Sequence, residues 1–357
     1  MRNRPIRHSS FAIRLCAAAL LALAPPAIAQ APGSALAELA AYAGSDRQQR
    51  LLEGARRDGV LNVYTSLPVD DMAALNTAFE KRTGVKVRIW RASSEKVVQR
   101  AIAEARAGRF DVDLIECGAP ALEILHREGL LQAVRSPHHA DLLPAAVPAH
   151  RAWGGARLNV FVHAYNTRLV KKEELPASYS DLLHPRWKGR LAIEASDDDW
   201  FAGVVGSMGE EKGLKLFRDI VATNGLSVRK GHSLLTNLVA SGEVPFALTV
   251  YSFTAEQLKQ KGAPLDWYVM PPAIARANGV AVARRAQHPH AALLYYDFMI
   301  GEEGQRILLK REFVPASRKL ETALNHGPLT IIDAAVLVDQ GERWAKLYEE
   351  IVVKGAR

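Results

Sequence analysis

Short apolar segments alternate with longer amphipathic segments from residue 60 onward, and the two periodicities predict different elements. Residues 60–64, 85–90 and 112–115 are apolar or strictly alternating, which is typical of buried or half-buried strands. Residues 70–83 and 95–107 place apolar side chains three or four positions apart, which predicts amphipathic helices. The predicted strands begin about 26 residues apart, a spacing that suits right-handed βαβ units and a parallel sheet.

The same alternation continues toward the C-terminus after a looser region. Residues 136–155 contain three prolines and two adjacent glycines and predict a loop, whereas the apolar run 158–165 predicts a strand. Further strands are predicted at residues 190–195, 227–230, 245–251, 266–270 and 279–284. Further helices are predicted at residues 120–129, 211–223, 234–240, 254–261, 289–300 and 302–311, with one more that starts near residue 198 and one within residues 331–354. Residues 30–57 indicate a short amphipathic helix before the first strand.

The predicted elements form two α/β lobes joined by two chain crossings, near residues 158–166 and 266–272. We expect each lobe to hold a mixed sheet flanked by helices, with a cleft between the lobes. The expected boundaries are residues 30–160 with 271–325 for lobe 1, residues 161–270 for lobe 2, and residues 326–357 for a C-terminal helix packing on the lobes.

The first 29 residues have the pattern of a Sec signal peptide. Four arginines without any acidic residue precede an apolar run at residues 15–24 that is too short to span a bilayer. The small-x-small sequence Ala27-Ile28-Ala29 predicts cleavage near Ala29 and a periplasmic address. Loss of the four arginines lowers the net charge from +8 to +4, so the charge does not indicate a nucleic-acid partner.

The composition is typical of a soluble globular protein, with 48% hydrophobic and 24% charged residues among 357. It excludes collagenous, disordered, disulfide-stapled and multispan membrane classes. Cys16 belongs to the predicted signal peptide, and Cys117 alone cannot form an internal disulfide. We therefore expect Cys117 to be a small buried side chain. We also expect the protein to be a soluble monomer.

Ligands of open α/β sheets bind beyond the carboxyl ends of the strands, so the residues at those ends form the candidate site. The candidate ligand-binding residues are Thr65, Ser66, Ser93, Ser94, Glu116, Ser196, Asp197, Trp200, Tyr251 and Ser252. Ser93 or Ser94 is expected to cap the helix that follows, and free N–H groups there favour an anion or a polar ligand. A cap without any ligand is the alternative interpretation.

Acidic residues in the same loops favour a positively charged ligand rather than an anion. Glu116 follows an apolar strand and could bind a metal or a cationic ligand, or lie solvated at the surface. The run Asp197-Asp198-Asp199 could stabilise a helix start through the helix dipole, or repel an anion and favour a cation or a neutral polar group. Trp200 would then supply an aromatic wall facing the cleft.

Signatures of catalysis are weak in this sequence. Residues 206–209 lack the first glycine of a nucleophile elbow, and the chain has neither a P-loop nor a dinucleotide-binding glycine pattern. The sequences His138-His139 and His288-Pro289-His290 lie in predicted loops without an accompanying cysteine or carboxylate pattern, so we expect structural or exposed roles for them. We therefore predict that the protein is not an enzyme.

Several short motifs, in this order after the signal peptide, resemble extracellular solute-binding proteins of ABC importers. They are Leu61-Asn-Val-Tyr-Thr-Ser66, Phe79-Glu-Lys-Arg-Thr-Gly84, Phe110-Asp-Val-Asp113, Trp187-Lys-Gly-Arg190, and Pro289-His-Ala-Ala-Leu-Leu294 before Tyr296-Asp-Phe298. The resemblance runs from about residue 50 to 325 and is strongest to the branch containing periplasmic ferric-iron-binding proteins. It implies a type II periplasmic binding fold that captures one small ligand, closes by a hinge motion and delivers the ligand to an ABC permease and its ATPase.

The resemblance also implies ferric ion as the default ligand, held with a synergistic anion and without a required cofactor. Ferric binders of this branch use adjacent tyrosines after the strand that here ends at Val250, and sometimes a glutamate at the position of Glu116. This chain keeps Tyr251 but has Ser252 where the second phenolate is expected. Ferric ion prefers several anionic oxygen ligands, and Glu116 and Tyr251 would supply only two.

Three alternatives stay open at the level of the sequence. Related branches bind phosphonates, polyamines or thiamine, and Ser66, Ser94, Tyr251 and Ser252 could hydrogen-bond such an organic solute. A secreted α/β enzyme with the same two-lobed fold is a second alternative. A ligand-sensing ectodomain that reports to a membrane receptor is the third.

Overall fold

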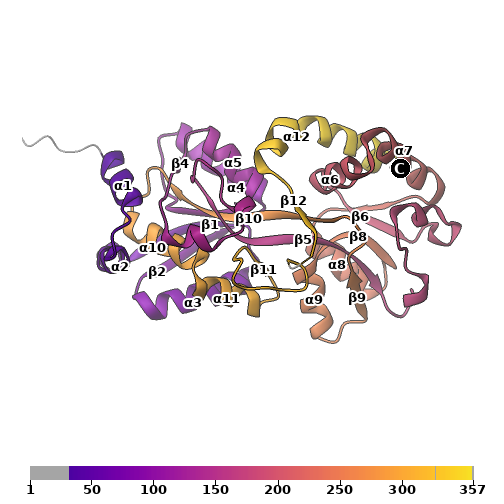
Figure 1. The fold of residues 1–357 in the computed structure, drawn as a ribbon, viewed down its shortest axis with the longest axis horizontal. Coiled ribbons are helices and arrows are strands. Elements are labelled where there is room, and N and C mark those ends of the chain that lie inside the picture. The colour runs from indigo at the N-terminus through magenta and orange to yellow at the C-terminus, as the bar shows by residue number, and fades with distance from the viewer. Residues whose placement is uncertain (1–31, 326, 356–357) are drawn as a thin grey trace, which may run out of the picture. The chain divides into compact units, whose positions relative to one another are not determined.

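A computed structural model describes residues 32–325 and 327–355 (Figure 1). The predicted signal peptide and its cleavage site lie outside these described residues. Within them, no helix combines the length and the apolar character that a membrane span requires. The N-terminal part of the described chain holds two helices, α1 (Pro32–Ala41) and α2 (Arg47–Asp58), where the sequence indicated one.

The described strands form one twelve-stranded sheet, and its main path runs β2-β1-β3-β10-β5-β8-β6-β7. The strands on this path are β1 (Val60–Thr65), β2 (Lys86–Arg91), β3 (Leu114–Gly118), β5 (Gly154–Asn166), β6 (Leu191–Glu194), β7 (Ser227–Arg229), β8 (Phe246–Tyr251) and β10 (Ala273–Ala283). Off the path lie β4 (Leu131–Gln132), β9 (Leu265–Tyr268), β11 (Val314–Pro315) and β12 (Leu329–Ile331). Strands β1, β2 and β3 pair in parallel, and β6 pairs in parallel with β7 and β8, as the βαβ spacing predicts.

Strand β5 connects the two regions of this sheet (Figure 1). Its first part pairs with β10, from Val160 opposite Ala275 to Gly154 opposite Val280. Its second part pairs with β8 and β9 instead, beginning at Phe161 opposite Tyr251. The chain passes into the second region along β5 and returns between β9 and β10. The predicted two crossings are therefore present, but β10 starts at Ala273, six residues before the predicted strand.

Helices cover both faces of the sheet. They are α3 (Val69–Thr83), α4 (Ser94–Arg106), α5 (Ala119–Arg127), α6 (Asp198–Met208), α7 (Glu210–Asn224), α8 (His232–Ser241), α9 (Ser252–Gln260), α10 (Pro289–Ile300), α11 (Glu302–Lys310) and α12 (Ala334–Tyr348), which runs on into a π-helix at Glu349–Lys354. Helix α10 is enclosed along nearly its whole length, because Ala291 to Ile300 are all buried. It forms the centre of a core beneath β1 and β5, with which it is in contact.

The C-terminal helix α12 lies across both regions of the structure (Figure 1). It contacts α5 of the first region and α6 of the second. An exposed ion pair of 2.5 Å joins Arg127 of α5 to Asp339 of α12. At the far end, the Tyr348 hydroxyl donates a hydrogen bond of 2.5 Å to the backbone carbonyl of Glu194. Helix α12 therefore spans the junction between the two regions.

Candidate functional site

Glu116 is the best-anchored of the predicted site residues. It lies on β3 with its side chain fully buried, and its Oε1 accepts a hydrogen bond of 2.9 Å from Arg157 of β5. Its Oε2 accepts from the Thr65 hydroxyl at 2.6 Å and from the backbone N–H groups of Ser66 and Leu67 at 3.2 and 3.1 Å. Because both carboxylate oxygens are engaged, Glu116 stabilises the carboxyl ends of β1 and β3.

The serines before α4 behave as the sequence predicted for a helix start. The Ser93 hydroxyl accepts a hydrogen bond from the backbone N–H of Lys96, which confirms it as the cap of α4. The Ser94 hydroxyl accepts from the backbone N–H of Gly118 at 3.1 Å. This bond ties the start of α4 to the end of β3, so the Ser94 hydroxyl has a structural partner.

A second cluster of polar side chains lies where β8, α6 and β10 approach one another. The Arg276 guanidinium of β10 contacts Asp199 of α6 at 2.6 Å and donates a hydrogen bond to the Tyr251 hydroxyl. The Tyr251 ring stacks on His232 of α8 with ring centroids 3.8 Å apart. The predicted Tyr251 therefore lies in a network with Asp199 of the acidic run and with Arg276 and His232, which the sequence did not single out for ligand binding.

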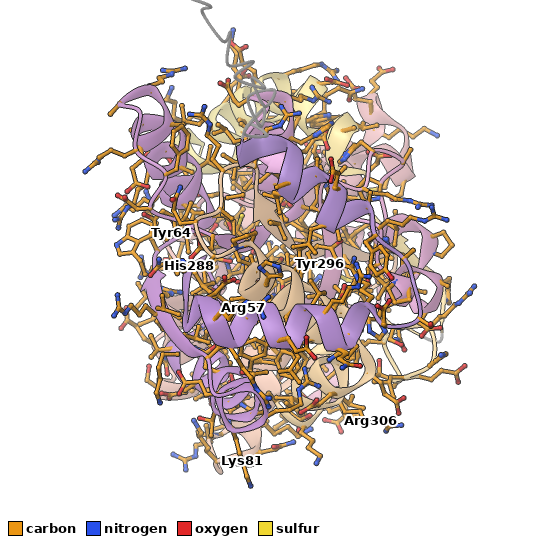
Figure 2. All side chains as sticks on the ribbon, turned by 90° about the vertical axis from the view of Figure 1, so that its left-hand side faces the viewer. Arg57, Tyr64, Lys81, His288, Tyr296 and Arg306 are labelled. Atoms are coloured by element: carbon orange, nitrogen blue, oxygen red, sulfur yellow. The ribbon has the colours of Figure 1, made fainter. Side chains whose placement is uncertain are left out.

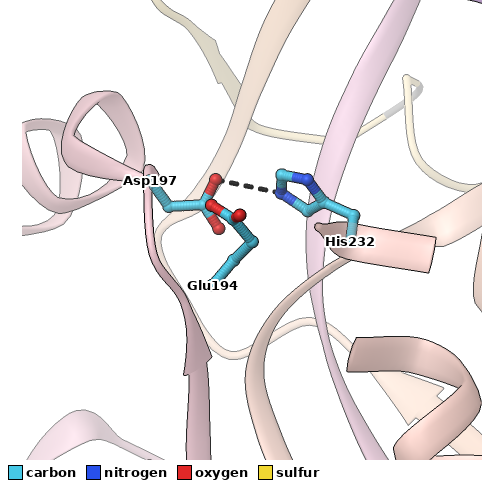
Figure 3. Close-up of side chains that lie close together, drawn as sticks. All are labelled: Glu194, Asp197 and His232. Atoms are coloured by element: carbon cyan, nitrogen blue, oxygen red, sulfur yellow. Dashed lines mark ion pairs between the residues drawn. The ribbon is translucent and has the colours of Figure 1, made fainter. Parts of the chain in front are cut away.

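Three acidic and basic side chains of the same region form a compact cluster (Figure 3). Glu194 ends β6, Asp197 lies just before α6, and His232 begins α8. Their nearest ligand atoms lie within 4.8 Å of one another, the one such group of at least three His, Cys, Asp or Glu residues in the described part of the chain. The cluster contains the predicted Asp197, whereas the neighbouring Ser196 is exposed and donates its backbone N–H to Glu194.

The structure corrects the expected role of Trp200. Its side chain is 1% exposed and packs edge-on against Tyr179 and Phe217 in the core of the second region. Trp200 therefore does not form an aromatic wall of the cleft. The helical spacing explains the outcome, because residue 200 is buried on the inner face of α6 along with Phe201 and Val204, whereas Asp198 is only partly buried. Ser252, at the start of α9, is also buried.

A pocket of about 550 Å³ lies between the two sheet regions, beneath α12. Its lining residues are Glu95, Pro120 and Ile124 of the first region, Asp198, Asp199 and Arg276, and Leu337, Val338, Gly341, Glu342 and Ala345 of α12. We call this the α12 pocket. It combines an apolar wall with four carboxylates and one guanidinium, and that guanidinium is already paired with Asp199.

Burial makes the acidic groups of this region resist ionisation. It raises the pKa of Asp198 to about 6, with the neighbouring Asp199 carboxylate adding to the effect. Burial is also the main cause of the raised pKa values of Asp199 and Glu194. Crowded, partly desolvated carboxylates of this kind would gain from a positively charged partner.

The histidine motifs singled out in the sequence have structural partners, as expected. His288, labelled in Figure 2, lies with its Nδ1 2.8 Å from the Asp113 carboxylate, and its backbone N–H also donates to Asp113. The His139 Nε2 is 2.7 Å from the Tyr296 hydroxyl. The backbone N–H of His290 donates to Asp58 at 3.0 Å. These residues join the loops to the helices and do not line the α12 pocket.

Sequence reasoning missed Arg157, Arg276 and His232. The two arginines lie inside apolar strands, and an arginine in an otherwise apolar strand is the signal that could have found them. His232 follows Gly231 at a helix start, which is the same kind of position as that of the selected serines.

The strand order and the two connections between the sheet regions define a type II periplasmic binding fold, and solved structures show the same fold. The iron-bound structure of HitA from Pseudomonas aeruginosa superposes with a TM-score of 0.72 at 23% identity, covering 82% of this chain and 99% of that one. The structure of AfuA from Actinobacillus pleuropneumoniae with bound fructose-6-phosphate gives a TM-score of 0.73 at 21% identity, with coverages of 83% and 99%.

The sequence profile described as "Bacterial extracellular solute-binding protein" matches residues 113–337, more than half of the chain, and the chain belongs to this family. The Fe(3+)-binding periplasmic protein of Serratia marcescens is 25% identical over 266 residues, covering 72% of this chain and 78% of that protein. The chain is thus the solute-binding component of an ABC importer, as the resemblance implied, and its family consists of binding proteins that work with a permease and an ATPase.

Proposed function

We propose that the solute of this importer component is a small organic cation, bound in the α12 pocket between the two sheet regions. The observation that carries the proposal is the charge of the pocket. Four carboxylates line it, from Glu95, Asp198, Asp199 and Glu342, against one guanidinium that already forms an ion pair. An anionic solute would meet an excess of like charge there, whereas a cation would relieve the repulsion among the carboxylates.

The size and the walls of the pocket support an organic solute rather than a bare ion. A volume of about 550 Å³ lies within the range of small-molecule sites. Pro120, Ile124, Leu337 and Val338 provide apolar surface against which a carbon skeleton can pack. The Arg276 Nε is buried without a hydrogen-bond partner and can donate to an acceptor on the solute. Polyamine-like and thiamine-like cations fit this chemistry, and a phosphonate does not.

Ferric ion, free or held with a synergistic anion, is the second candidate, favoured by the names of the relatives. The Serratia marcescens relative is named as an Fe(3+)-binding protein, and HitA was solved with iron bound. In this chain the Glu116 carboxylate is fully buried and its charge is paired with Arg157, and the Tyr251 hydroxyl faces Arg276. Ferric ligation by Glu116 and Tyr251 would require both arrangements to open.

We further propose that the protein acts in the periplasm as a monomer after Sec export and removal of residues 1–29. Residues 30–160 with 271–325 would move against residues 161–270 about β5 and the segment between β9 and β10. Helix α12 contacts both parts and would follow the movement. The closed form would be the one that the permease receives.

Thermal unfolding with matched ligand panels tests the proposed solute class. Polyamines and thiamine form the cationic panel, and phosphonates and sugar phosphates form the anionic panel. We expect a concentration-dependent rise in Tm with a member of the cationic panel only. Ferric citrate is the third arm, and a visible phenolate-to-iron band that disappears in Tyr251→Phe would favour iron. A rise in Tm with the anionic panel alone would refute the proposal.

A further inference from the structure

We propose that Glu194, Asp197 and His232 form a binding site for a divalent transition-metal ion, separate from the α12 pocket. The three residues come from the end of β6, the loop before α6 and the start of α8 (Figure 3). The site does not depend on the identity of the solute, because it uses none of the residues that line that pocket.

Asp197 provides the observation that points to a ligand. Its side chain is fully buried, yet neither carboxylate oxygen has a hydrogen-bond partner. Its ion-pair contact is with the His232 Nε2. A buried carboxylate without hydrogen bonds is costly, because its desolvation is not offset. Asp197 is therefore placed for a partner of another kind.

The contact between Asp197 and His232 has the geometry of two ligands rather than of a hydrogen bond. The His232 Nε2 lies 2.9 Å from the Asp197 Oδ1, but neither this nitrogen nor this oxygen makes a hydrogen bond. Two donor atoms that each lie about 2.1 Å from one ion, at tetrahedral or right angles, are separated by roughly 3 Å. The observed spacing suits a shared ion.

Glu194 completes the set and is already held in place. Its Oε1 accepts the backbone N–H of Gly231 at 2.8 Å, and its Oε2 accepts that of Ser196 at 2.5 Å. Each oxygen keeps a second lone pair for an ion. Hydrogen bonds of this kind to a ligating carboxylate are typical of metal centres. The ligand atoms all lie within 4.8 Å of one another, so binding of an ion requires a contraction of at most about 0.6 Å.

The charges around the cluster favour a cation. Glu194 and Asp197 are buried together, and the adjacent Asp198 and Asp199 are opposed by Arg276. His232 is stacked on Tyr251, which fixes the plane of its ring. Two carboxylates and one imidazole suit zinc, manganese or ferrous ion, with a position left for water. A bound ion would join the β6–α6 loop to the start of α8.

Metal titration of the chelator-treated protein tests this site. We expect calorimetry with Zn²⁺ and Mn²⁺ to show one equivalent bound by at least one of the two ions, confirmed by elemental analysis after dialysis. The variants Asp197→Asn and His232→Gln should each weaken binding more than about tenfold. Asp219→Asn, which changes an exposed aspartate paired with Lys215, should leave the affinity unchanged.

Two further measurements distinguish this site from an ion bound at the Tyr251 phenolate and from misfolding of the variants. Tyr251→Phe should retain the bound ion, whereas loss of binding in that variant would assign the ion to a phenolate site and overturn the proposal. Far-UV circular dichroism of the metal-free variants checks their folding, and Glu194→Gln replaces any variant that fails to fold. Absence of stoichiometric binding, or unchanged affinity in folded Asp197→Asn, would also overturn it. Solute binding measured in chelator reports on the α12 pocket alone.

Discussion

The Arg157 guanidinium and the Glu116 carboxylate form an ion pair of 2.9 Å in which the two side chains are 3% and 0% exposed. Arg157 projects from the connecting strand β5, and Glu116 from β3 of the first sheet region. Thr65 and the backbone N–H groups of Ser66 and Leu67 complete the coordination of the carboxylate. The pair thus fixes the loop after β1, where a ligand of this fold would be expected, and Arg157 neutralises the buried Glu116 carboxylate there.

Removal of the Glu116 charge should destabilise the protein strongly. In Glu116→Gln the shape is kept but the buried Arg157 loses its counter-charge, which costs about 3–5 kcal/mol of unfolding free energy. Urea denaturation measures the change. The exposed pair Arg82–Glu303 supplies the control, since Glu303→Gln should cost less than about 1 kcal/mol. A cost below about 1 kcal/mol for Glu116→Gln would contradict the structural role.

Asp198→Asn should stabilise the ligand-free protein at neutral pH. The pKa of Asp198 is about 6 in the folded protein, against an ordinary 3.8, so the folded state binds more protons than the unfolded state between these values. The contribution of Asp198 to the unfolding free energy therefore falls as the pH rises from about 4 to 6. The variant should gain about 1–2 kcal/mol at pH 7.5, allowing for solvent screening, and almost nothing at pH 4.

Denaturant titrations of wild type and Asp198→Asn at several pH values, with chelator present, measure this difference. Asp339→Asn is a suitable control, because Asp339 is exposed and its partner Arg127 is a surface residue. A gain that stays constant from pH 4 to 7.5 would show that Asp198 does not titrate in this window.

Cys117 should be inert toward thiol reagents in the folded protein. It is fully buried on β3, and burial raises the pKa of its thiol well above the usual value, with the adjacent Glu116 adding to the shift. A disulfide reagent should therefore react only after denaturation. Rapid stoichiometric reaction with the native protein would mean that the end of β3 opens readily.

Trp200→Phe should weaken the fold without affecting solute binding. The smaller ring loses part of the edge contacts with Tyr179 and Phe217 and leaves a cavity, at a cost of about 1–3 kcal/mol. Thermal unfolding measures the loss, and titration with the solute should give an affinity within twofold of wild type. A tenfold loss of affinity at unchanged Tm would instead place Trp200 in the binding site.

The order of elements and the parallel pairing could be predicted from the sequence because each depends on local periodicity. The 26-residue spacing and the capping of α4 by Ser93 are local properties, and the structure confirms both. The ion pairs of Glu116 with Arg157 and of Asp199 with Arg276 join residues 41 and 77 positions apart. Such pairs depend on which strands become neighbours, and spacing along the chain does not determine this.

Trp200 shows the same limit within a single helix. The sequence placed it beside three aspartates at a helix start, and the choice between cleft and core depended on which face of α6 meets the sheet. That orientation follows from the packing of α6 against α7, α12 and β10. The local pattern therefore predicts the helix start, but it does not determine the direction in which the side chains of α6 point.

In the proposed function the α12 pocket selects a positive charge, and calorimetric titration of the chelator-treated protein tests this selection most directly. The cation that raises Tm most in the thermal panel should bind with one-to-one stoichiometry to wild type. Its affinity should fall about tenfold in Asp198→Asn, which corresponds to about 1.4 kcal/mol of binding free energy. For wild type the affinity should fall below about pH 6, because Asp198 becomes protonated. Two results together would contradict this selection. They are tight binding of a phosphorylated anion that is unchanged or strengthened in Asp198→Asn, and no binding of any cation in the panel.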